Sequence, residues 1–136
     1  MNTADFHKLV HLVLDSPAKP PHHLFDKGFD DWHARARLAH FLVMPDSPQK
    51  ETGIELFKSM VDSDIDEENV EDVEEKVFAL QTLGLCLRDA EETREESLSY
   101  INLAIELAES TDFLYKYILR GELWADRWNT LHLLKQ

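Results

Sequence analysis

The 136-residue chain has few of the residues needed for cross-links, phosphate loops or membrane insertion. Cys86 is the only cysteine, so no disulfide can form within the chain. The four glycines are not grouped into a phosphate-binding loop. No apolar run approaches the roughly 20 residues that a bilayer requires, and the N-terminus lacks the pattern of a secretory signal. These absences predict a cytoplasmic protein with no membrane partner.

Basic residues are scarce in the middle of the chain. Residues 62–96 contain 14 acids and 3 bases, which accounts for −11 of the net charge of −13. Phosphate binding needs lysine and arginine, so a nucleic-acid partner is excluded. The region would attract a basic protein or peptide, although a solvated face without a partner has the same composition. The acidic patch consists of Asp62, Asp64, Asp66, Glu67, Glu68, Glu71 and Asp72.

Helical periodicity is what the chain does have, and no segment alternates as a β-strand would. The sequence therefore predicts an all-α fold of about six helices in a single domain. Residues 1–28 hold an amphipathic helix, about 3–15, and a proline-rich linker. Residues 29–63 form a first helical hairpin, residues 64–110 a second hairpin with its first helix at about 70–88, and residues 111–136 a C-terminal helix.

Two local signals predict helix starts. Ser47-Pro48 offers a capping hydroxyl before a proline at the first helical position. Thr93 and Glu96 have the spacing of a capping box, in which each side chain accepts a hydrogen bond from a free backbone N–H of the other's residue. We expect helices to begin at these two places.

One pattern occurs twice. Arg37–Leu42 is echoed by Thr82–Leu87 at an interval of 45 residues, and Phe57 is matched by Ile101 at an interval of 44. A pair of helices that recurs at such an interval is typical of stacked helical hairpins.

Residues 80–109 resemble a tetratricopeptide repeat, and the resemblance extends more loosely over residues 30–134. The matching positions are Leu80, Leu83, Gly84, Leu87, Ser97, Ile101 and Ala104. Tyr117, Gly121 and Trp124 are similar to the first helix of a further unit, 37 residues after Gly84. The resemblance implies a short right-handed array of antiparallel hairpins in which Gly84 and Ala104 let helices approach closely. An ordinary antiparallel helical bundle is the alternative.

The resemblance also implies a function: a non-enzymatic scaffold or adaptor that binds a protein or peptide. In such arrays the first helix of each unit lines a concave binding face. Mapped onto this chain, that face consists of His33, His40, Met44, Gln81, Arg88, Tyr115, Glu122 and Asp126.

Two other functions fit parts of the sequence. An acidic inhibitor or immunity-type protein would use the acidic patch to cover a basic partner. A helical metal-dependent hydrolase would use histidines of the first two helices, such as His7 with His11 or His33 with His40. Since spacing identifies no third ligand, we predict no metal site, no cofactor and no catalytic residue. His33 and His40 are also candidates for pH-sensitive contacts.

Trp124 and Trp128 lie one turn apart and therefore share a face of the last helix. With no helix after it, this face predicts either a cover for the end of the array or a docking patch. A homodimer formed through the Trp124 and Trp128 face is one way to cover it.

Overall fold

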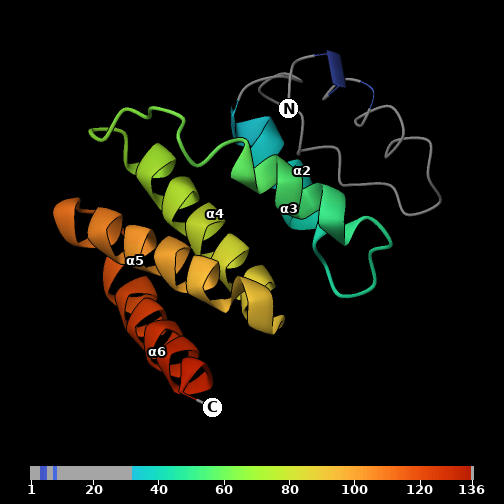
Figure 1. Cartoon of the computed structure of the whole chain (residues 1–136). Helices are drawn as coiled ribbons and strands as arrows, with labels where there is room; N and C mark the ends of the chain where they lie inside the picture. The colour runs from blue at the N-terminus through green and yellow to red at the C-terminus, as the bar shows by residue number, and fades with distance from the viewer. Residues whose placement is uncertain (1–3, 6–7, 9–31, 136) are drawn as a thin grey trace. The chain divides into compact units, whose positions relative to one another are not determined.

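The computed structural model describes residues 4, 5, 8 and 32–135 (Figure 1). The predicted proline-rich linker and most of the predicted helix at 3–15 lie outside these residues. So do His7 and His11, and with them the histidine pair proposed for a hydrolase.

The predicted all-α fold is confirmed: the described part of the chain contains helices and no strand. Its helices are α2 (Trp32–Leu42), α3 (Lys50–Lys58), α4 (Val70–Arg88), the 3₁₀ helix η2 (Glu91–Thr93), α5 (Arg94–Ser110) and α6 (Lys116–Leu134). The chain divides into two compact units, residues 1–63 and residues 64–136. Searched over the described residues, no helix is both long and apolar enough to cross a membrane.

In the first unit, α2 packs against α3 as a hairpin around a small apolar core (Figure 1). Leu38, Leu42 and Phe57 are fully buried in it. Gly53 lies at a close approach between α3 and the end of α2. A Cβ on Gly53 would stand 2.7 Å from Val43 Cγ1 and 2.9 Å from the Cβ of Leu42 in α2. The hairpin therefore closes only because α3 has no side chain at this point.

In the second unit, α5 packs against both α4 and α6, and α4 touches α6 over a smaller area (Figure 1). The core joins side chains of all three helices: Val73, Val77, Leu80, Leu83, Ile101, Ala104, Leu119 and Leu123. α4 begins where predicted because the Asn69 side chain accepts hydrogen bonds from the backbone N–H groups of Glu71 and Asp72. The acidic first turn also suits the positive end of the helix dipole.

Gly84 provides the close approach between α4 and α5 that the sequence predicts. A Cβ on Gly84 would stand 2.7 Å from Ile101 Cγ1 and 3.2 Å from the carbonyl oxygen of Ser97. The Ser97 hydroxyl donates a 2.6 Å hydrogen bond to the Gly84 carbonyl across the same gap. Ala104, also predicted at this seam, is fully buried.

The two predicted helix starts differ from the structure in detail. The capping box at Thr93 is wrong: no side chain caps α5, because the Thr93 hydroxyl donates to the carbonyl oxygens of Leu87 and Ala90 instead. Those carbonyls belong to the end of α4 and the turn after it, so the hydroxyl closes the hairpin loop. Near Pro48, α3 begins at Lys50, and the Ser47 hydroxyl accepts a hydrogen bond from the Gln49 N–H.

Candidate protein interface

Helix α6 is apolar on two opposite sides. Its inner side buries Leu119, Leu123 and Thr130 in the second unit. Its outer side and the turn before it carry a row of exposed apolar side chains with a glycine in the middle, which we call the outer row: Leu114, Tyr117, Ile118, Gly121, Trp124 and Trp128. Tyr117 is 78% exposed, Trp128 64% and Trp124 46%. A contiguous apolar surface of this kind is typical of an interaction site.

Polar contacts fix the inner side and one flank of α6 to the rest of the unit. Gln81 Nε2 of α4 donates a 3.0 Å hydrogen bond to Asp126 Oδ2. On the α5 side, Arg127 Nε donates to Asn102 Oδ1 at 3.0 Å, and Arg120 forms a 2.6 Å ion pair with Glu109. The outer row thus stands on a helix whose orientation within the unit is determined.

The two tryptophans of the outer row are also held by neighbours on the same helix. The Arg127 guanidinium lies 5.6 Å from the centre of the Trp124 ring, a cation–π distance. The Trp128 ring stacks on His132 with centres 5.4 Å apart and planes 3° from parallel. Because each ring already has a neighbour that restricts it, less side-chain entropy is lost when a partner covers it.

Gly121 lies in the middle of the outer row. Among the described residues, no atom lies within 4 Å of the place that a Cβ on Gly121 would take, in contrast to Gly53 and Gly84. A glycine inside a helix costs about 1 kcal/mol relative to alanine. The packing of the described residues therefore gives no reason for glycine at this position.

Of the predicted concave-face residues, several are engaged inside their own unit. Gln81 is buried and bonded to Asp126, so both are used between α4 and α6. His33 stacks on Trp32 with ring centres 4.2 Å apart. Arg88 is half-buried, and one guanidinium nitrogen, Nη1, has no hydrogen-bond partner among the described residues.

Three other members of the predicted face, Met44, Tyr115 and Glu122, are exposed. Tyr115 and Glu122 belong to α6 or the turn before it and lie near the outer row in the chain. A binding role for the whole predicted set stays a prediction.

His40 lies in the first hairpin with its ring edge-on to the Phe57 ring, at 4.9 Å between centres. Burial lowers the pKa of His40 from 6.5 to about 4, because the charged ring would lose its hydration. His40 is therefore neutral near pH 7 and cannot act there as the pH-sensitive contact that its type suggests.

The acidic patch has a local structural role at the start of α4. Its residues are exposed except for Asp72, which is half-buried. Asp66 Oδ1 accepts a 3.0 Å hydrogen bond from the Glu68 N–H and shapes the turn before the helix. Glu71 and Asp72 form the acidic first turn of α4. This role explains part of the charge without a partner.

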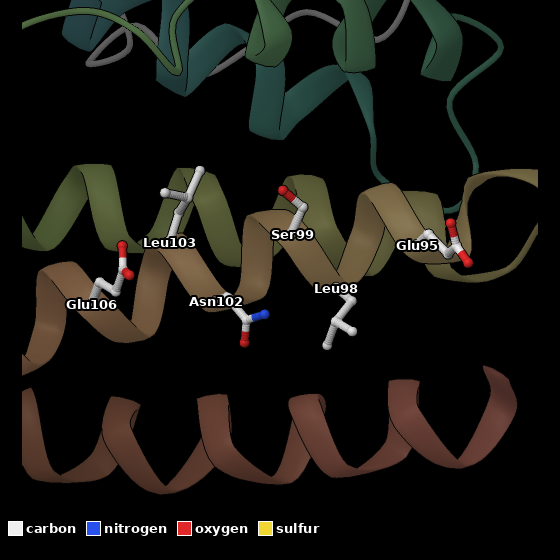
Figure 2. Close-up of a pocket in the computed structure, with 6 residues that line it drawn as sticks. All are labelled: Glu95, Leu98, Ser99, Asn102, Leu103 and Glu106. Atoms are coloured by element: carbon white, nitrogen blue, oxygen red, sulfur yellow. The ribbon is translucent and has the colours of Figure 1, made fainter. Parts of the chain in front are cut away.

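A shallow depression of about 420 Å³ lies along α5 (Figure 2). Its lining comes from this helix alone: Glu95, Leu98, Ser99, Asn102, Leu103 and Glu106. Figure 2 shows Leu98 and Asn102 on the side of α5 that faces α6, with Ser99 and Leu103 on the opposite side. The sequence pattern gave no signal for this depression. The Asn102 Oδ1 atom in this lining already accepts a hydrogen bond from Arg127.

Within the part of the chain that the structure describes, no three histidine, cysteine, aspartate or glutamate side chains come together as a metal site. The Cys86 thiol is free of disulfides and half-buried on α4. Comparisons of this chain with protein-family models, with curated proteins and with solved structures gave no match.

Proposed function

We propose that this chain is a non-enzymatic protein-binding module and that the outer row of α6 is its docking surface. The observation that supports the proposal is the exposure of five large apolar side chains on one side of a helix whose other side is buried. Covering apolar surface is favourable at roughly 25 cal/mol per Å², so a partner that removes the row from water gains affinity.

The composition of the row suits a protein partner. Tryptophan and tyrosine are enriched among the residues that dominate binding energy at interfaces. Their two rotatable bonds lose little entropy when they are fixed, and Arg127 and His132 already restrict Trp124 and Trp128. The row therefore offers rigid aromatic anchors.

The proposal places docking on the outer side of α6 instead of on the concave face that the repeat resemblance implies. Gln81 and Asp126 of that face already bind each other, so a partner would have to displace their hydrogen bond. The outer row needs no such displacement, because its large side chains are exposed in the chain itself.

Affinity capture with a tagged chain tests the proposal. Tyr117→Ser with Trp128→Ser removes two exposed anchors, and Leu103→Ser, an exposed apolar residue of α5, is the matched control. We expect the native chain and the control to retain the same proteins in proportion to bait, and the double variant to lose them. Retention of every protein by the double variant, with helical circular dichroism unchanged, would contradict the proposal.

A further inference from the structure

Helices α4 and α6 carry the same row at an interval of 37 residues. Val77, Leu80, Gly84 and Leu87 of α4 correspond to Leu114, Tyr117, Gly121 and Trp124. In α4 every member of the row is buried, and Gly84 lies against Ile101 of α5. In α6 the same row is exposed. The row through which α4 packs against α5 thus corresponds to the row that α6 exposes among the described residues.

Gly121 shows what kind of partner fits. At Gly84 the missing side chain lets an antiparallel helix come close enough for a serine hydroxyl to reach the glycine carbonyl. At Gly121 no atom of the described chain lies within 4 Å of the position that a Cβ would take. A glycine between aromatic residues of one face leaves a gap suited to the backbone or a small side chain of a crossing helix.

We infer that the outer row binds α6 of a second copy of this chain, with the two helices antiparallel and crossing at Gly121. This inference rests on the proposed function and names its partner. With a two-fold axis at Gly121, each glycine faces its equivalent. Ile118 of one copy then lies opposite Trp124 of the other, and Tyr117 opposite Ala125. Trp124 then meets the apolar Ile118 side chain of the other copy, and Tyr117 meets the small Ala125 side chain. The outer row is therefore complementary to a second copy of itself.

The exposed area is large enough for a stable pair. Complete coverage of the outer row removes roughly 700 Å² per copy, or about 1,400 Å² in total, which falls within the range of specific interfaces. Tyr117 and Trp124 of each copy would lie about one turn from the axis, near the centre of the interface, where contributions to binding are largest, and Trp128 would be buried at the end of the row.

The charges on α6 favour a second copy over an acidic protein. The helix carries three bases and two acids, and Asp126 is turned inward to Gln81. Arg120 is paired with Glu109, and Arg127 is bonded to Asn102 and placed over Trp124. These arginines are already engaged, so an acidic partner would find little uncompensated positive charge. The net charge of −13 lies mainly in residues 62–96 rather than on this helix.

Sedimentation equilibrium of the full chain over a range of concentrations tests the inference. We expect the mass to rise from 15.8 kDa toward twice that value. Trp128→Glu should keep the chain monomeric, whereas the matched control Leu103→Glu, on α5, should not. Gly121→Ala should weaken self-association by at least about tenfold, because its methyl group occupies the crossing point.

A cross-link tests the position of the axis. In a Cys86→Ser background, Tyr117→Cys and Ala125→Cys chains are mixed in equal amounts, because the proposed crossing places these two positions opposite each other at the short Cα separation of a disulfide and leaves Gly121 unchanged. We expect oxidation to give a covalent dimer at concentrations where Ser99→Cys, on α5, gives none. A dimer by mass without this cross-link would overturn the antiparallel crossing.

A chain that stays monomeric at all concentrations would overturn the second copy as partner. The proposed function would then depend on the capture experiment alone. If the Tyr117 and Trp128 double variant fails to capture another protein that the native chain captures, a different protein occupies the outer row. If capture also shows no loss, the proposed function fails as well.

Discussion

The two hairpins solve the same packing problem with glycine on opposite helices. In the α2–α3 hairpin the glycine is Gly53 of the second helix, and its missing Cβ would stand 3.1 Å from the Ala39 carbonyl oxygen. In the α4–α5 hairpin it is Gly84 of the first helix, 3.2 Å from the Ser97 carbonyl oxygen. Ala39 precedes Gly84 by 45 residues and Gly53 precedes Ser97 by 44, the intervals of the repeated pattern.

In each hairpin the two helices approach closely because one of them has a glycine at the crossing point. The glycine can lie on the first helix or on the second. The small residues of the two crossings fall at matching positions of the repeated sequence pattern. α6 extends the comparison, since Gly121 takes the place of Gly84 while no helix within residues 32–135 packs against it. Substitutions at these positions test whether the crossings respond alike.

The largest expected difference between the hairpins is in their response to acid. His40 of the first hairpin corresponds to Leu85 of the second. The pKa of His40 is about 4 in the folded chain and 6.5 when the ring is free, so the unfolded chain takes up the proton first as pH falls. Stability is therefore lost as the pH falls from 6.5 through 4, on the order of 3 kcal/mol.

His40→Phe removes this titration and keeps a ring against Phe57. We expect urea denaturation to show that the native chain loses more stability than the variant between pH 6.5 and 4. Carboxylates also titrate there, but they are common to both proteins. Parallel pH profiles for the two would refute the assignment.

Alanine at the two covered glycines should destabilise both hairpins by similar amounts. The added methyl group overlaps Ile101 in Gly84→Ala and Leu42 in Gly53→Ala. Overpacking costs about 1–3 kcal/mol, and the better helix propensity of alanine returns about 1 kcal/mol, so we expect a net loss of up to about 2 kcal/mol in each case. Thermal unfolding would measure it. Gain of stability at either site would show that the crossing is loose.

Ser97→Ala tests the polar part of the second crossing. The variant removes the buried hydrogen bond from the Ser97 hydroxyl to the Gly84 carbonyl and keeps the small volume. We expect a loss of about 1 kcal/mol in the free energy of unfolding, measured by denaturant titration. Ser99→Ala, on the exposed side of the same helix, is the control and should change little.

The smallest effect should have the opposite sign. Gly121→Ala meets no neighbour within the described residues, so alanine gains helix propensity without a clash. At a concentration where the chain is monomeric, we expect the variant to be more stable by up to about 1 kcal/mol. Destabilisation under those conditions would mean that the chain itself uses the space at Gly121.

Much of the fold was predictable because the information is local. Helix α4 begins and ends where its periodicity predicts, and the structure shows that the Asn69 side chain caps its start. The capping box was wrong because the Thr93 hydroxyl can either accept or donate, and spacing cannot say which. Gly84 was predicted at the close approach, whereas the opposite placement at Gly53 requires the two helices to be seen together.

The candidate site was only half predictable. Helical spacing puts Trp124 and Trp128 on one face. It cannot show that Gln81 and Asp126 of the predicted concave face bond to each other, since 45 residues separate them. Helical spacing also cannot show that α5 packs against Gly84 while no described residue packs against Gly121, because both glycines occur in the same sequence pattern.

The most direct measurement of whether the outer row docks a second copy is quenching of its tryptophans. In a Trp32→Phe variant only Trp124 and Trp128 emit, and both are exposed in the single chain. We predict that acrylamide quenching weakens and emission shifts to shorter wavelength as the protein concentration rises through the monomer–dimer transition. Quenching that stays constant while the mass doubles would place the interface elsewhere and contradict the docking role of α6.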